Sequence, residues 1–168
     1  MLKRPNAPEL LGVYILTYRL CEAAQIKLLD LPNAAELLKV YISELPLCSE
    51  AELKMLDLPN AAELLKVYIS EYPLCNEAEL KMLDLPNATE LFKVYSKYPL
   101  CLAVQLKLFE HPEAAELVKM YISKHRFLEE AELRLLFLPN IKELAEMYVS
   151  KWGLGKKAQL KCWHKLMQ

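Results

Sequence analysis

The chain has 168 residues and a formal net charge of −1, with 54% apolar and 26% charged residues. This composition excludes a disordered chain, and the near-neutral charge argues against a general attraction to nucleic acid or to an anionic membrane. Only three glycines occur, which argues against Gly-rich phosphate loops, while the abundant Ala, Glu, Leu and Lys favour helices.

The N-terminal segment resembles a signal peptide, because Lys3 and Arg4 precede a short apolar run. The run is too short, two prolines and Glu9 stand before it, and no small-residue cleavage site follows. We interpret the segment as folded structure. No apolar stretch approaches the ~20 residues that span a bilayer, so we expect no contact with a membrane.

A period of about 27 residues runs through nearly the whole chain. Prolines recur at 5, 32, 59, 86, 112 and 139, and tyrosines at 14, 41, 68, 95, 121 and 148. Such self-similarity is typical of stacked repeats. The pattern predicts a single repeat domain over 1–168, with repeats at 5–31, 32–58, 59–85, 86–111, 112–138 and 139–165.

Each repeat is expected to form two short helices. In the second repeat, Asn33 followed by Glu36 predicts a capping box that starts a helix of about 11 residues. Pro46 ends this helix. Ser49 followed by Glu52 predicts a second capping box and a helix of 8–9 residues. Helices this short persist only when stacked neighbours bury their apolar faces.

These features predict an all-α fold, an α-solenoid (superhelix) of six two-helix repeats. The spacing of Ala34, Leu37, Leu38 and Tyr41, with an early Ala51 in the second helix, resembles the tetratricopeptide-repeat family in a shortened form. That family's unit has about 34 residues, and its Trp and Gly are absent here. The resemblance implies antiparallel helix pairs stacked in a superhelix, with peptide binding on the inner surface.

The array has three irregularities. The fourth repeat lacks one residue near Tyr95, where we expect an early helix end or a local distortion. The first repeat replaces a lysine and a serine by Gly12 and Leu16, so extra apolar surface either faces another chain or packs differently. Residues 1–85 carry eight Lys/Arg and thirteen Asp/Glu, whereas residues 86–168 carry thirteen and nine. Net charges of −5 and +4 either favour head-to-tail contacts or reflect drift among solvated side chains.

Cys21, Cys48, Cys75 and Cys101 share one repeat position. Equivalent positions in stacked helices lie ~8–10 Å apart, beyond the reach of a disulfide. We therefore predict small, buried, free thiols in a reducing, cytoplasmic setting. Cys162 and His164 make only half of a metal site, so neither a metal nor a cofactor is expected.

Two charged series have explanations that need no ligand. The glutamates at 9, 36, 63, 90, 116 and 143 either cap helices or form a row that binds cations or a basic peptide. In the second helices, Lys54, Lys81 and Arg134 are predicted to pair with the glutamate four residues upstream.

A third series is the Lys–Ser stripe of the first helices. It consists of Lys39, Lys66, Lys93 and Lys119 with Ser43, Ser70, Ser96 and Ser123. The stripe is either a partner-binding surface or a solvated face with Glu–Lys pairs three residues apart. A second series mixes aromatic and other residues; its Tyr72, Tyr98 and Trp152 are further candidates for partner contacts. The six periodic tyrosines are predicted to be core, each hydroxyl bonding to the adjacent repeat.

The leading functional hypothesis is a non-enzymatic scaffold that binds a protein or peptide, acidic in character, along its groove. One alternative is a structural array that associates with itself through its N-terminal repeat. Another is an engineered or recently duplicated array without an evolved ligand. An enzyme is not expected, because catalytic residues are normally unique and most positions here recur. Nucleic acid is disfavoured because the second and third repeats lack a basic face.

Overall fold

The computed structural model describes residues 6–137 and 142–159. Throughout these ranges the regular structure is helical, and the chain divides into two compact units at Tyr95 and Ser96. The division falls within the repeat that lacks one residue. The prediction of a single repeat domain stays a prediction.

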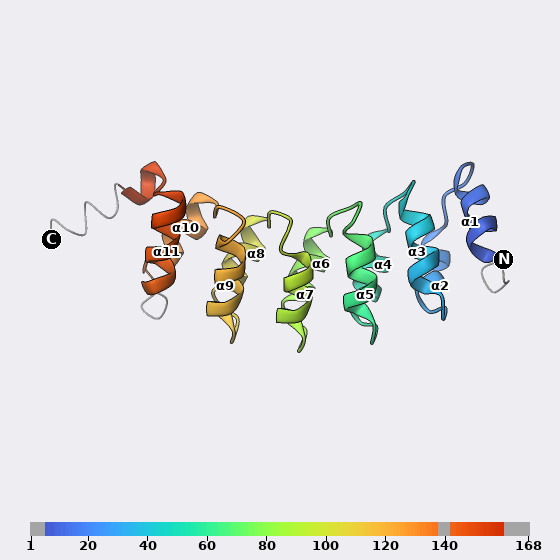
Figure 1. The fold of residues 1–168 in the computed structure, drawn as a ribbon, viewed down its shortest axis with the longest axis horizontal. Coiled ribbons are helices and arrows are strands. Elements are labelled where there is room, and N and C mark those ends of the chain that lie inside the picture. Colours follow the sequence, from blue (N-terminus) through green and yellow to red (C-terminus); the bar gives the residue numbers. More distant parts are fainter. Residues whose placement is uncertain (1–5, 138–141, 160–168) are drawn as a thin grey trace. The chain divides into compact units, whose positions relative to one another are not determined.

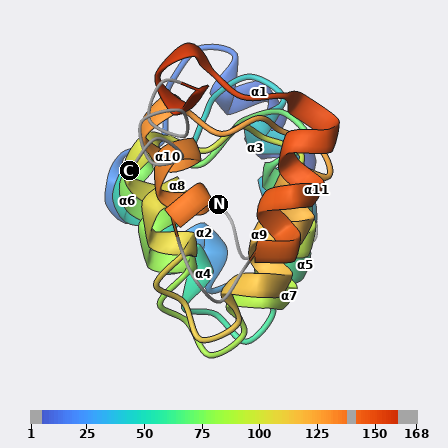
Figure 2. The ribbon, with the colours of Figure 1, turned by 90° about the vertical axis from the view of Figure 1, so that its left-hand side faces the viewer.

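The first unit contains seven helices in the described residues (Figure 1). They are α1 (Ala7–Ile15), α2 (Glu22–Leu29), α3 (Ala34–Ile42), α4 (Ser49–Leu56), α5 (Ala61–Tyr68), α6 (Asn76–Met82) and α7 (Ala88–Tyr95). Helices α1, α3, α5 and α7 pack successively in one layer, and α2, α4 and α6 pack in a second. Figure 2 shows α3, α5 and α7 on one side of this unit and α2, α4 and α6 on the other.

The second unit repeats the arrangement. It contains α8 (Leu102–Leu108), α9 (Ala114–Ile122), α10 (Glu129–Phe137), α11 (Lys142–Trp152) and further helical residues at 156–159. Helix α9 packs on α11, and α8 packs on α10. Both units thus show the helix packing of an α-solenoid, which confirms the predicted fold class.

The core of both units follows the predicted repeat positions. The periodic tyrosines Tyr41, Tyr68, Tyr95, Tyr121 and Tyr148 are at most 1% exposed. The periodic leucines of the first helices are buried as well, and so are the alanines Ala51, Ala78 and Ala131 of the second helices. The prediction that these tyrosines are core is therefore confirmed, except in the first repeat, where Tyr14 is 37% exposed. The predicted hydroxyl bonds to the adjacent repeat form at Tyr68, Tyr95 and Tyr121. The buried hydroxyls of Tyr41 and Tyr148 have no hydrogen-bond partner in the described residues, so this part of the prediction is wrong for them.

The predicted capping box of the first helices is wrong. Asn33 precedes α3 with φ −104° and ψ 30°, and its side chain makes no capping hydrogen bond. Instead, the Ala34 N–H donates to the Leu31 carbonyl at 3.0 Å, so Pro32 and Asn33 form the centre of a turn close to type I. The same bond joins Ala61 to Leu58. A backbone turn that proline preorganises therefore takes the place of the side-chain cap.

The second capping box is also wrong. Cys48, with φ −75° and ψ 160°, is the N-cap of α4, and Ser49 is already helical. The Cys48 carbonyl accepts the Glu52 N–H at 3.0 Å. The Glu52 side chain does not turn back to the cap but is buried between repeats.

The first helices α3, α5, α7 and α9 have 8–9 residues instead of the expected 11. Ser43 is the C-cap of α3, and its hydroxyl donates to the Val40 carbonyl at 2.8 Å. Ser70 and Val67 repeat this bond at 2.7 Å. Helix α7 ends at the same repeat position as α5, so the missing residue of the fourth repeat shortens the connection after the helix and not the helix itself.

Candidate functional site

The lysines of the Lys–Ser stripe are exposed near the C-terminal ends of the first helices. Lys39, Lys66 and Lys93 lie in the last turns of α3, α5 and α7 in the first unit, and Lys119 lies in α9 of the second unit. Within the described chain, Lys39, Lys66 and Lys119 form no ion pair or hydrogen bond. The alternative of Glu–Lys pairs three residues apart therefore does not account for these three lysines.

The serines of the stripe contribute less than expected. Ser43, Ser70 and Ser123 are exposed, but each hydroxyl donates to the backbone carbonyl three residues before it, at 2.6–2.8 Å. A hydroxyl has a single proton to donate, so these serines can only accept a hydrogen bond from a partner.

Ser96 does not belong to an exposed stripe, which corrects the prediction. Only 3% of Ser96 is exposed. The deletion in the fourth repeat removes one residue after the periodic tyrosine, so Ser96 occupies the position of the buried Ile69. Its polar groups are satisfied by the next repeat: Lys124 donates to the Ser96 hydroxyl at 2.9 Å, and a ring nitrogen of His125 lies 3.0 Å from its carbonyl oxygen.

Three cationic residues of the second helices, Lys54, Lys81 and Arg134, are engaged between repeats, and their predicted pairing was wrong. Lys54 lies 3.2 Å from Asp30, and Lys81 lies 2.6 Å from Asp57. The Lys81 ammonium also donates to the Leu53 carbonyl at 3.0 Å. In the second unit, Arg134 pairs with Glu110 at 3.0 Å. Each cation thus reaches the acidic residue at the end of the preceding second helix, and not the glutamate four residues upstream.

The candidate aromatic residues are half-buried and make contacts within the repeats or, for Trp152, with the preceding repeat. Tyr72 stacks at 6.2 Å on Tyr68, the ammonium of Lys97 lies 4.9 Å from the centre of the Tyr98 ring, and Trp152 donates its indole N–H to a backbone carbonyl at 2.9 Å. Tyr72 belongs to the first unit, whereas Tyr98 and Trp152 belong to the second. The predicted site therefore divides between the units.

A buried polar row, which we call the link residues, joins successive repeats. It was not singled out from the sequence, although the period of the chain contains it. Its members are Gln25, Glu52, Glu79, Gln105 and Glu132. Gln159 stands at the same repeat position, but it is exposed and its amide donates to Leu154 of its own repeat.

In the first unit, Glu52 of α4 shows how a link residue works. Its two carboxylate oxygens accept the Tyr68 hydroxyl at 2.8 Å and the Cys75 N–H at 2.6 Å, both from the next repeat. Burial, reinforced by this carboxylate, raises the pKa of Tyr68 above its usual range. The tyrosine therefore stays protonated and continues to donate.

In the second unit, Gln105 of α8 makes the equivalent contacts with a neutral amide. Its carbonyl oxygen accepts the Leu128 N–H at 2.8 Å. Its amide nitrogen donates to the Tyr121 hydroxyl at 3.1 Å and to the Leu100 carbonyl at 2.8 Å. An amide and a carboxylate are thus interchangeable at this position, because each offers an oxygen to the same backbone N–H.

The cysteines stand at the N-caps of the second helices. The four described cysteines are free thiols, and Cys162 lies outside the described residues. They are not buried as predicted: Cys21 is exposed, and Cys48, Cys75 and Cys101 are half-buried. The prediction failed because an N-cap lies at the helix end and not on the packed face. Burial raises the pKa of the Cys75 thiol, which disfavours the reactive thiolate.

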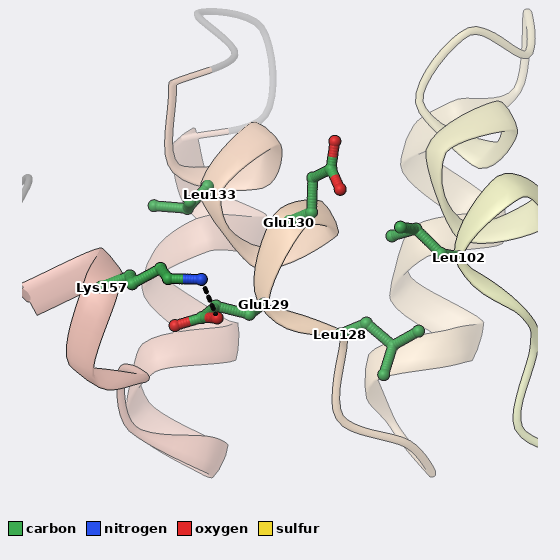
Figure 3. Close-up of a pocket in the computed structure, with 6 residues that line it drawn as sticks. All are labelled: Leu102, Leu128, Glu129, Glu130, Leu133 and Lys157. Atoms are coloured by element: carbon green, nitrogen blue, oxygen red, sulfur yellow. Dashed lines mark hydrogen bonds and ion pairs between the residues drawn. The ribbon is translucent and has the colours of Figure 1, made fainter.

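The second unit contains a hollow of about 390 Å³ beside α8 and α10 (Figure 3). Leu102, Leu128 and Leu133 form apolar walls, and Glu130 supplies a carboxylate. Glu129 and Lys157 also line the hollow, and the ion pair between them, at 2.8 Å, is drawn as a dashed line in Figure 3. The Lys157 ammonium lowers the pKa of Glu129. The sequence pattern did not indicate this hollow, because its walls come from two helices and a following segment.

The described residues offer little for cofactor chemistry. Within 6–137 and 142–159, no three His, Cys, Asp or Glu side chains gather in a way suited to a metal ion. His111 accepts the Glu113 N–H at its own turn, and His164 lies outside the described residues. Among the described helices, none has the length and apolar character needed to cross a bilayer.

Comparisons of the chain with protein-family models, curated proteins and solved structures find no match.

Proposed function

We propose that the protein is a non-enzymatic scaffold whose first helices bind an extended, acidic segment of a partner protein. The resemblance to the tetratricopeptide repeat supports binding of this kind. The row of free thiols fits a reducing, cytoplasmic environment.

The contrast between two sets of lysines carries the proposal. In the second helices, Lys54 and Lys81 are held by carboxylates of the preceding repeat. In the first helices, Lys39 and Lys66 are exposed and have no partner in the described chain, although Glu36 and Glu63 stand three residues away. Stacking therefore uses the ammonium groups of Lys54 and Lys81 and leaves those of Lys39 and Lys66 available for a ligand.

The repeat geometry specifies the spacing of the partner's acidic groups. Packed helices lie ~8–10 Å apart, and an extended chain advances about 3.3 Å per residue. A partner running across α3, α5 and α7 therefore meets a lysine about every third residue. The exposed glutamates in the first turns of these helices, such as Glu36, repel acidic groups and direct the partner toward the helices' C-terminal ends.

The test measures binding of a defined probe. The probe is a fluorescent peptide of about nine residues with glutamate at every third position. Exposed ion pairs contribute about 0.2–1 kcal/mol each. The combined variant Lys39→Gln, Lys66→Gln and Lys93→Gln should therefore bind the probe roughly 3- to 150-fold more weakly than the parent, as measured by fluorescence anisotropy at low salt.

The matched control removes three lysines from the other helix layer. The combined variant Lys27→Gln, Lys54→Gln and Lys81→Gln has the same net charge and should keep the parent affinity. A peptide with the same composition but three adjacent glutamates should bind the parent less well than the spaced probe. Equal weakening by the two triple variants would reduce the effect to net charge and overturn the proposal.

A further inference from the structure

The outer side of α1 exposes several large apolar side chains. Val13 is 70% exposed, Leu16 73% and Tyr18 60%, and Tyr14 is 37% exposed. In the equivalent positions of the other repeats, the five buried tyrosines are at most 1% exposed.

This exposed surface corresponds to the side that receives the preceding repeat elsewhere in the array. Tyr68 and Tyr95 place their hydroxyls on Glu52 and Glu79, the link residues of the repeats before them. Val40, the equivalent of Val13, lies close to the preceding first helix, because a Cβ added at Gly12 would meet it at 3.7 Å. In the described chain, Val13 and Tyr14 have no such neighbour. They form half of a repeat-to-repeat interface.

Helix α11 exposes the opposite half. Its Tyr148 is fully buried, but Val149 is 37% exposed. Val149 is equivalent to Ile42 and Ile122, which are 1% exposed, and to Ile15 of α1, which is 6% exposed. Thus α1 buries Ile15 and exposes Tyr14, whereas α11 buries Tyr148 and exposes Val149. The two exposed surfaces correspond to the two sides that meet wherever one first helix packs on the next.

The charges of the two units favour contact between copies of the chain. The first unit carries nine Lys/Arg and fourteen Asp/Glu, and the second carries twelve and eight. Net charges of −5 and +4 attract a first unit to the second unit of another molecule.

We propose that the protein associates head to tail, with the α1 surface at Val13 and Tyr14 of one copy packing on the α11 surface at Val149 of a second copy. The contact extends the repeat stacking from one molecule to the next. It is heterologous, so association continues into chains or rings and does not stop at a symmetric dimer. The inference does not depend on the lysines of the Lys–Ser stripe.

The test follows the molar mass against protein concentration by sedimentation velocity. The parent should assemble progressively, and added salt should weaken assembly because the attraction between units is screened. Val13→Lys and Val149→Lys should each raise the concentration needed for assembly at least tenfold. Leu128→Lys is the matched control, since Leu128 is 49% exposed but lies on neither surface, and should assemble like the parent.

An equimolar mixture distinguishes head-to-tail contact from other arrangements. The Val149→Lys chain keeps an intact α1 surface, and the Val13→Lys chain keeps an intact α11 surface. Mixed, they should form a dimer and no larger species. If Val149→Lys alone dimerises while Val13→Lys stays monomeric, α1 pairs with α1 and the proposal is wrong. A parent that remains monomeric at all concentrations would also overturn it.

Discussion

At the scale of single residues, the link residues connect one repeat to the next through groups that would otherwise be buried without partners. Glu52 is 4% exposed and Gln105 is 1% exposed. Both accept the N–H of the N-cap position of the following repeat, and both bond to its periodic tyrosine. The common requirement is an oxygen acceptor, and a negative charge is not needed.

The first prediction separates hydrogen bonding from charge at Glu52. Glu52→Gln should keep the free energy of unfolding within about 1 kcal/mol of the parent, because Gln105 makes the equivalent contacts. Glu52→Leu should lower it by about 2 kcal/mol or more, since the Cys75 N–H and the Tyr68 hydroxyl lose their partner. Urea denaturation followed by circular dichroism measures both. Equal destabilisation by the two changes would show that the charge itself is required.

At the scale of helices and turns, the starts of the first helices depend on backbone geometry. The Leu31–Ala34 turn supplies the hydrogen bond that a capping side chain was expected to supply. Glu113 occupies the N-cap position of α9 and likewise makes no side-chain cap. The position therefore tolerates residues that cap poorly.

The second prediction concerns this turn. Asn33→Ala should change the free energy of unfolding by less than about 0.5 kcal/mol, whereas loss of a true N-cap typically costs about 1 kcal/mol. Pro32→Ala is the comparison and should cost about 0.4–1 kcal/mol, because proline restricts the unfolded chain at a position that the turn favours. Chemical denaturation measures the free energy of unfolding of both variants and of the parent. If Asn33→Ala lowered the free energy of unfolding by about 1 kcal/mol or more, the Asn33 side chain would have to cap the helix after all.

The elements show which features sequence reasoning can reach. The 27-residue period predicted the helix pairs, their order and the buried tyrosines, because stacking repeats the same environment in every unit. Capping could not be predicted in the same way, since Pro32-Asn33 suits both a turn and a cap. The partner of Lys54 also could not be predicted from the sequence. Glu50 is near Lys54 in sequence, whereas Asp30 is near it only after the repeats stack.

Two misses in the candidate site have related causes. Glu52 was interpreted as a capping partner of Ser49, which concealed that the link residues recur with the period. Ser96 was assigned to the Lys–Ser stripe because other repeats also have a serine shortly after the periodic tyrosine. The deletion shifts the register after Tyr95, so the serine takes the place of a buried isoleucine.

At the scale of the whole molecule, we infer that each repeat is a module and that equivalent contacts join it to its neighbours. Stability in such arrays is approximately the sum of repeat and neighbour terms. Removal of one internal repeat should then preserve the remaining interfaces. Deletion of residues 32–58 brings Gln25 to Tyr68 and Cys75, a pairing equivalent to that of Gln105 with the next repeat.

The most direct measurement is urea denaturation of this deletion variant, followed by far-ultraviolet circular dichroism. The account predicts the parent's helical signal per residue and a cooperative transition, at a lower urea concentration because one interface is lost. A shorter chain with much less helix per residue, or with no cooperative transition, would contradict the claim that the repeats are interchangeable modules.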